Sequence, residues 1–278
     1  MSDAGQGQQA RTPLLLTDFP FDAADQERLR AALGTDRFVQ APGREAFRAA
    51  LAAHSDAEIV CTFRPPDDLL TLVPRLRWLA LASAGAEHIL RMELARQEHG
   101  LLITTANGVH SVPISEFVLS MMLVWVRKWP RILDDQRQAI WLRGEAHDAL
   151  MGGELAGATL GLIGVGAIGR RVAQLAHAFG MRVVATRRSP APQSPDADVD
   201  QWVSADRLED LLEQADVVAI CIPSTPETRS MITAHRLHQM KRSALLINIA
   251  RGDTVDEDAL IAALHDGTIA GAALDVFA

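Results

Sequence analysis

Cysteine is scarce in this chain of 278 residues, which contains only Cys61 and Cys221. Both lie in apolar runs typical of β-strands, so we expect two buried free thiols in a reducing compartment and no disulfide. The polar N-terminus lacks the apolar segment of a signal peptide. The apolar stretch at 112–126 contains Pro113 and Glu116 and is too short to span a bilayer. The sequence therefore predicts a cytoplasmic protein.

Basic residues are fewer than acidic residues, which gives a formal net charge of −8. This charge argues against a nucleic acid or an anionic membrane as partner. Metal-ligand spacing is missing among the His, Cys and Asp residues, so we predict no metal site. The Gly-x-Ser-x-Gly pattern of a serine nucleophile is also missing. Apolar residues are abundant, at 48% of the total, which is enough to bury a large core in two domains.

Strand-like apolar runs alternate with helical segments along the chain, which predicts an α/β architecture with parallel sheets. We expect one doubly wound domain at 1–106 and a second at 107–278. The predicted strands lie at 14–17, 58–63, 78–82, 101–105, 160–164, 182–186, 216–221, 244–249 and 270–276, and the first predicted helices at 23–32 and 44–53.

A long helical region is expected over roughly 114–143. Its face with Phe117, Met121, Trp125 and Trp129 is suited to cover a partner subunit as well as its own sheet. An ordinary core helix would show the same pattern, so the sequence leaves both interpretations open.

Three glycines, Gly164, Gly166 and Gly169, stand between the apolar run 158–163 and a helical segment at 168–179. Glycine at this spacing allows a tight strand-to-helix turn, close approach of the backbone to a pyrophosphate, and close packing of the helix on the strand. The helix N-terminus then offers unpaired N–H groups and the positive end of its dipole to the phosphates. This context predicts a Rossmann-type dinucleotide-binding turn.

The end of the next strand carries Arg187, Arg188 and Ser189, where a chain that binds NAD usually places an acid for the ribose 2′-OH. Two arginines and a hydroxyl supply positive charge and donors for a 2′-phosphate. We therefore predict NADP(H) as the preferred cofactor and NAD(H) as the second choice. The alternative is a solvated arginine pair at a strand end.

Further motifs accompany the glycine turn in a fixed order. They are LAGATLG at 155–161, ADVV at 215–218, IPSTPETR at 222–229, INIARG at 247–252, VDE at 255–257 and GAALDV at 271–276, with looser matches ASAGAEH at 82–88 and NGVH at 107–110. In this combination the chain resembles the D-isomer-specific 2-hydroxyacid dehydrogenase family. The resemblance implies a flavodoxin-like substrate domain at 1–106 and an NAD(P)-binding Rossmann domain at 107–278, and we expect a homodimer.

The resemblance also implies hydride transfer between a nicotinamide and carbon 2 of a small 2-oxo or 2-hydroxy acid. Arg251 would bind the carboxylate or carbonyl oxygen of the substrate, and backbone amides of Ser83, Ala84 and Gly85 would hold the carboxylate. Glyoxylate, hydroxypyruvate and larger 2-oxo acids remain open as substrates. Beside the three glycines, the implied cofactor contacts are Ala167, Ile168, Arg187, Arg188, Ser189, Ile222, Pro223, Thr228, Ile249, Ala250, Arg251 and Asp275, the last near the nicotinamide amide.

The general acid of the family is a histidine paired with a glutamate, and both follow the motif that here ends at Ala278. The chain stops before them, so we expect a fragment of a longer enzyme, in which residues 1–278 bind nucleotide but reduce 2-oxo acids poorly. His88 and His110 are weaker candidates for the acid. The alternative function is a non-catalytic dinucleotide-binding protein that senses redox state or serves as a scaffold.

Overall fold

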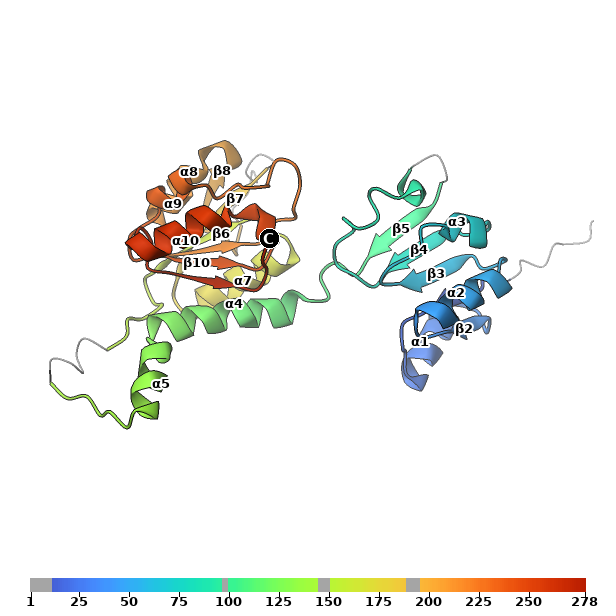
Figure 1. Ribbon diagram of the computed structural model, residues 1–278, viewed down its shortest axis with the longest axis horizontal. Helices are drawn as coiled ribbons and strands as arrows, with labels where there is room; N and C mark the ends of the chain where they lie inside the picture. The colour runs from blue at the N-terminus through green and yellow to red at the C-terminus, as the bar shows by residue number, and fades with distance from the viewer. Residues whose placement is uncertain (1–11, 97–99, 145–150, 189–195) are drawn as a thin grey trace, which may run out of the picture. The chain divides into compact units, whose positions relative to one another are not determined.

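The computed structural model describes residues 12–96, 100–144, 151–188 and 196–278. The chain divides into two compact units, Met1–Val109 and His110–Ala278, each of which contains a parallel β-sheet with helices around it (Figure 1). Two parallel-sheet α/β domains were the predicted fold class, and this prediction is confirmed. Cys61 and Cys221 lie in different units as free thiols.

The first unit has a five-stranded sheet in the order β2-β1-β3-β4-β5. Its strands are β1 (Leu15–Thr17), β2 (Phe38–Gln40), β3 (Ile59–Thr62), β4 (Trp78–Leu81) and β5 (Leu102–Thr105). The connecting helices are α1 (Ala23–Leu33), α2 (Arg44–Ala53), α3 (Leu69–Leu72) and the short turn η1 (Glu93–Ala95). Leu16, Leu51 and Val60 are fully buried in the core that joins α2 to the sheet.

The second unit has a six-stranded sheet in the order β11-β10-β9-β6-β7-β8. Its strands are β6 (Thr159–Ile163), β7 (Arg182–Arg187), β8 (Gln201–Ser204), β9 (Val217–Ile220), β10 (Leu245–Asn248) and β11 (Gly271–Leu274). Its helices are α4 (Ser111–Val126), α5 (Trp129–Arg137), α7 (Ala167–Ala178), α8 (Leu208–Gln214), α9 (Ala234–Gln239) and α10 (Glu257–Asp266), with short turns η3 (Ala205–Arg207) and η4 (Gly252–Thr254).

Helices cover both faces of the second sheet: α4 and α7 pack on one face, and α8, α9 and α10 on the other (Figure 1). The chain runs outward from β6 to β7 and β8, then crosses back to place β9, β10 and β11 on the opposite side. The strand order therefore reverses between β6 and β9. Open parallel sheets bind their ligands at the carboxyl edge beside such a reversal.

The region expected to be helical over roughly 114–143 is helical as far as Arg137 but is not one continuous helix. The chain instead forms α4 and α5, which are separated at Lys128, whose φ of 53° interrupts a right-handed helix. Pro130 then lies in the first turn of α5, where its missing N–H costs nothing. The expected apolar face is divided as a result, because Phe117 packs on the core of the sheet whereas Trp129 is exposed on α5.

Candidate functional site

The turn between β6 and α7 contains the three glycines of the predicted nucleotide-binding motif. Gly164 has a φ of 93°, and a Cβ atom there would lie 2.5 Å from Cγ2 of Ile222. A Cβ atom on Gly169 would lie 2.3 Å from the carbonyl oxygen of Gly164. A Cβ atom on the exposed Gly166 would have no neighbour within 4 Å. Conformation and packing thus require glycine at two positions, and the third leaves the space that a pyrophosphate needs.

Helix α7 begins in that open space. Gly166 is its N-cap residue, and no side chain caps the first turn. The first N–H groups of a helix have no partner within it, and they carry the positive end of its dipole. Ala167 and Ile168, two of the predicted cofactor contacts, form the start of this turn. Their position suits a bound phosphate group.

Arg187 ends β7, the strand next to β6, and Arg188 follows it. The guanidinium carbon of Arg187 lies 5.2 Å from the ring centroid of Trp202 on β8, which is a cation–π distance. Arg188 is exposed, and Ser189 lies outside the described residues. Sequence reasoning missed Trp202, because the short strand β8 has no apolar run that would announce it.

Arg170 on α7 binds two carboxylates in the segment that leads to β8. Its Nη1 atom lies 3.0 Å from Oδ1 of Asp196 and 2.6 Å from Oδ2 of Asp198, and its Nη2 atom lies 3.2 Å from Oδ2 of Asp196. These bonds from Arg170, with a smaller contribution from the charge of Arg187, hold the pKa of Asp196 below its usual value. They anchor the segment to the helix that starts at the glycine turn.

The loop after β9 holds the predicted contacts Ile222, Pro223 and Thr228. The Thr228 hydroxyl donates to the Pro223 carbonyl (2.8 Å) and accepts the backbone N–H of Thr225 (2.7 Å). These bonds fold the loop back on itself at the carboxyl edge of the sheet. At the start of the loop, burial raises the pKa of the Cys221 thiol to about 12, so this cysteine is not a nucleophile at neutral pH.

Arg251 follows β10 in a loop that the buried Asn248 braces. Asn248 accepts the N–H of Ala250 through Oδ1 (3.0 Å) and donates through Nδ2 to the Arg251 carbonyl (2.9 Å). Ile249 and Ala250 are buried, whereas Arg251 is exposed and its Nη1 atom donates to the Ala250 carbonyl (2.7 Å). Sequence reasoning did not single out Asn248; its signal is a polar residue at the end of an apolar strand.

Two further contacts join the loops of this edge. The Ser224 hydroxyl donates to Oδ2 of Asp253 (2.8 Å) and so connects the loop after β9 to the loop after β10. Asp275 follows β11, is exposed, and donates its backbone N–H to the Asn248 carbonyl (3.0 Å). Apart from Ser189, the structure therefore places every predicted cofactor contact at the carboxyl edge of one sheet.

The predicted substrate-binding residues lie in the first unit, in the loop after β4. The Ser83 hydroxyl donates to the Gly85 carbonyl (2.7 Å), and the Ser83 carbonyl accepts the N–H of Ala106 just past β5 (2.9 Å). Ala84 is exposed between them. The candidate residues are thus divided between the units, with Ser83, Ala84 and Gly85 in the first and all the predicted cofactor contacts in the second.

The first sheet also carries an acidic residue that sequence reasoning missed. Asp18 follows β1, and its Oδ2 atom accepts the hydroxyl hydrogen of Thr62 at the end of β3 (2.9 Å). Its Oδ1 atom is buried and has no hydrogen-bond partner among the described residues. Burial raises the pKa of Asp18 above its ordinary value, although the bond from Thr62 works in the opposite direction. Because the strand order reverses between β1 and β3, Asp18 stands at the switch point of this sheet.

The described residues offer no further support for a general-acid histidine or a metal site. His88 and His110, the weaker candidates for a general acid, are both exposed. Among the described residues, no group of three or more His, Cys, Asp and Glu side chains is placed to hold a metal ion. Within the same ranges, none of the helices combines the length and the apolar character needed to cross a membrane.

The second unit matches a family model described as the NAD-binding domain of D-isomer specific 2-hydroxyacid dehydrogenases, over residues 119–278. The chain is also 39% identical, over 215 residues, to glyoxylate reductase of Aeropyrum pernix. That match covers 76% of this chain and 62% of the relative, so the chain spans less than two thirds of the relative's length.

Two solved structures share the fold over nearly the whole chain. D-lactate dehydrogenase of Aquifex aeolicus, complexed with NAD and lactic acid, is 29% identical with a TM-score of 0.70, covering 95% of this chain and 77% of that one. A D-isomer specific 2-hydroxyacid dehydrogenase of Xanthobacter autotrophicus, in complex with NADPH and MES, is 26% identical with a TM-score of 0.77, covering 96% and 81%. One of these two neighbours thus holds NAD and the other NADPH.

Proposed function

The chain belongs to the D-isomer specific 2-hydroxyacid dehydrogenase family, and from that premise we propose that it transfers a hydride between NAD(P)H and carbon 2 of a small 2-oxo or 2-hydroxy acid. The proposal is carried by the edge of the second sheet, where the glycine turn after β6 and Arg251 after β10 flank the end of β9. The names of two relatives, a glyoxylate reductase and a D-lactate dehydrogenase, agree with acids of this class.

In this proposal Arg251 binds the substrate. A guanidinium offers paired donors in one plane to a carboxylate, and it places positive charge where a ketone oxygen becomes negative during reduction. Asn248 holds the backbone on both sides of Arg251, so the loop is ordered before substrate arrives. Backbone amides of the Ser83–Gly85 loop hold the carboxylate, and Asp275 contacts the amide of the nicotinamide. The nicotinamide, once bound, supplies or accepts the hydride.

Substitution of Arg251 tests the proposed reaction. In a version of the protein that includes the family's glutamate and histidine, Arg251→Ala should lower kcat/KM for glyoxylate by about two to three decades, because a charged contact in a desolvated site is lost. Dinucleotide binding should remain. Arg251→Lys should recover only part of the activity, since an ammonium lacks the planar fork. Arg242→Ala, at the opposite edge of the sheet, is the matched control and should leave activity unchanged.

Near-full activity in Arg251→Ala would remove Arg251 from the reaction. If a version of the protein that includes the family's glutamate and histidine failed to oxidise NADPH or NADH with any of glyoxylate, hydroxypyruvate or a longer 2-oxo acid, the proposed reaction as a whole would be contradicted.

We further propose that NADPH is preferred to NADH. Arg187 and Arg188 at the end of β7 place positive charge where the 2′-phosphate would lie, and the ring of Trp202 supports the first of them. Arg187→Asp should reverse the preference, because it replaces a phosphate partner with a like charge. Fluorescence titration with both dinucleotides measures this, with Arg182→Ala at the other end of β7 as control. Equal affinities in the unmodified protein would contradict the proposal.

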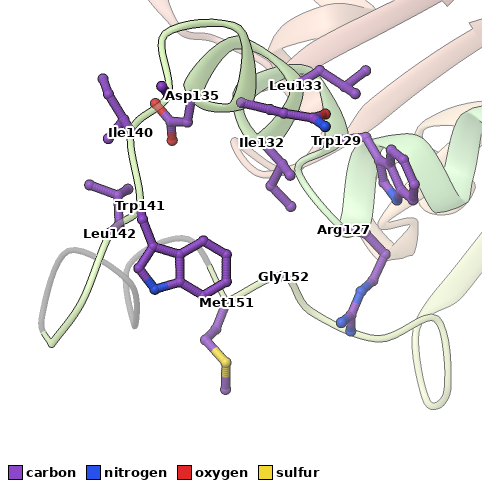
Figure 2. Close-up of a pocket in the computed structure, with 12 residues that line it drawn as sticks. Arg127, Trp129, Ile132, Leu133, Asp135, Ile140, Trp141, Leu142, Met151 and Gly152 are labelled. Carbon is purple, nitrogen blue, oxygen red and sulfur yellow. The ribbon is translucent and has the colours of Figure 1, made fainter.

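We also propose a homodimer, with an interface on the described residues 127–144 and 151–152, which we call the arm. Figure 1 shows α5 leading away from the sheet of the second unit. Apolar side chains of the arm surround a hollow of about 830 Å³ (Figure 2). The main apolar members of its lining are Trp129, Ile132, Leu133, Ile140, Trp141 and Met151.

The arm offers both a hollow and a projecting group, because the Trp141 side chain is 82% exposed. A surface with both features can be complementary to itself about a two-fold axis, which is the commonest symmetry of soluble oligomers. Monomers rarely leave apolar patches of this kind in water, and tryptophan is the typical anchor of an interface. A second copy of the chain is therefore the occupant we assign.

Sedimentation of the purified protein tests this interface. The unmodified protein should sediment as a dimer, and Trp141→Ser should shift it toward monomer without loss of helix content. Ile261→Ser, an exposed apolar position on α10, is the matched control. A monomeric unmodified protein, or a Trp141→Ser dimer of unchanged affinity, would refute the assignment.

A further inference from the structure

We infer that Trp202 is a positioning residue for dinucleotide selectivity: its indole face holds the Arg187 guanidinium in place for the 2′-phosphate of NADPH. This inference rests on the proposed preference for NADPH, and it assigns a role to a residue of β8 that lies outside the motifs quoted from the sequence.

Strand register places the two side chains on the same face of the sheet. β7 and β8 are parallel neighbours, with Ala185 opposite Trp202. Ala185 and Trp202 both pack in the apolar cluster beneath α7, whereas Val203 packs on the opposite face. Arg187 lies two residues beyond Ala185 and therefore projects to the α7 side, diagonally across from Trp202. This is the side on which the glycine turn and the helix N-terminus lie.

The contact uses the face of the ring, with the guanidinium carbon 5.2 Å from the ring centroid. The N–H groups of arginine lie in the plane of its guanidinium, so stacking on an aromatic face does not consume them. A stacked arginine can therefore still present a two-pronged set of donors to a phosphate. The ring limits the directions in which a long, flexible side chain extends, which prepares it for the ligand.

The polar group of the indole does not explain the position of Trp202. Buried tryptophans usually find a hydrogen-bond partner, yet the Nε1 atom of Trp202 is buried without one among the described residues. An apolar residue of similar size would fill this place without that cost. The feature that tryptophan adds here is its extended π-face, the best aromatic surface for a cation.

The acidic group near Arg187 is already bound by another arginine. Asp196 contributes to the electrostatic surroundings of Arg187, and a carboxylate in this position would compete with a phosphate. Arg170 binds Asp196 through both of its terminal nitrogens, at 3.0 Å and 3.2 Å, and also binds Asp198 at 2.6 Å. Both carboxylates thus have a guanidinium partner on α7, and the electrostatic interaction of Asp196 with Arg187 is the weaker one.

Dissociation constants for NADPH and NADH, measured for a set of variants, test the inference. Trp202→Leu removes the π-face but keeps an apolar side chain, and it should weaken NADPH binding about tenfold while NADH changes less than about twofold. Trp202→Phe retains an aromatic face and should recover most of the NADPH affinity. Arg182→Ala, at the other end of β7, should change neither constant.

The double variant separates positioning from a structural role. If Trp202 acts through Arg187, then Trp202→Leu should cause no further loss of NADPH selectivity in an Arg187→Ala background. Equal weakening of both dinucleotides by Trp202→Leu, no weakening of either, or an undiminished effect in the Arg187→Ala background would each overturn the inference. An unmodified protein without NADPH preference would refute the proposed cofactor choice first, and the role of Trp202 with it.

Discussion

Strands β6, β9 and β10 of the second unit are buried at every residue, whereas strands β2 and β5 of the first unit are half-buried or exposed along their length. Helices cover both faces of the second sheet. In the first unit, α1 buries none of its residues. A parallel sheet with both faces covered consists of continuous apolar runs, and burial holds it together. The first unit has a shallower core and leaves polar groups such as Asp18 at its edge.

The difference matters for function because the two sheets hold loops of different kinds. The glycine turn rests on β6, whose five residues are all buried, and its geometry leaves two glycine positions without room for a side chain. The Ser83–Gly85 loop depends instead on a few hydrogen bonds near the end of an edge strand. We expect the glycine turn after β6 to tolerate substitution poorly and the Ser83–Gly85 loop to tolerate it better.

Substitution of core leucines should have the largest effect on stability. It also tests whether the two units unfold independently. Leu51 on α2 and Leu211 on α8 are both 0% exposed, and replacing either by Ala should cost about 2–5 kcal/mol. Each substitution should lower the unfolding temperature of its own unit only. Differential scanning calorimetry of the two variants resolves this. One transition that shifts equally in both would show that the units unfold together.

Glycine substitutions should have the next largest effect on stability. They compare a steric overlap in the second unit with backbone strain in the first. Gly169→Ala in the second unit should destabilise by about 1–3 kcal/mol, because its methyl group overlaps the Gly164 carbonyl oxygen. Gly34→Ala in the first unit meets no neighbour within 4 Å and pays only for its φ of 61°, about 1 kcal/mol. Gly166→Ala should unfold normally and weaken dinucleotide binding. Chemical denaturation measures the order, and a Gly34→Ala loss larger than that of Gly169→Ala would contradict it.

Burial also explains which elements the sequence could predict. The nine predicted strands agree with observed strands to within two residues, since an apolar run is visible without knowledge of its partners. β2 has three half-buried residues and β8 is mixed in polarity, so neither had a periodic signal. The break between α4 and α5 depends on the conformation of Lys128, and only Pro130 hinted at it.

The features of the candidate site also fall into two groups, those that the sequence could predict and those that it could not. The glycine turn could be predicted because each glycine answers a local demand of the backbone. The interactions of Trp202, Asn248 and Asp18 could not be predicted, because they depend on groups that the fold brings near: a guanidinium across a strand pair, the loop after β10, and a hydroxyl on the next strand. Residue type alone carries no information on such partners.

A smaller effect is expected from the carboxylate at the edge of the first sheet. The pKa of Asp18 is raised by burial, so the folded unit binds a proton more readily than the unfolded chain. The contribution of Asp18 to stability therefore falls as pH rises from about 4 through the raised pKa, and is constant above it. The Asp18→Asn variant lacks this loss. Its unfolding temperature, compared with that of the unmodified protein at the same pH, should therefore rise as the pH goes from acidic to neutral. A difference between the two proteins that does not vary with pH would contradict this assignment.

The smallest expected signal is the reactivity of the two thiols, one in each unit. Burial raises the pKa of Cys221 to about 12, so its thiolate is scarce at pH 7. The pKa of Cys61 is also raised, first by burial and to a lesser degree by the charge of Asp18, while a hydrogen bond with Thr17 opposes the shift.

We expect neither thiol to react rapidly with iodoacetamide in the folded protein. Cys61, in the unit with the shallower core, should react before Cys221. Asp18→Asn should speed the labelling of Cys61 and leave Cys221 unchanged, because removing a nearby negative charge favours the thiolate. Mass spectrometry of the labelled peptides distinguishes the two sites, and faster labelling of Cys221 would reverse the contrast between the two units.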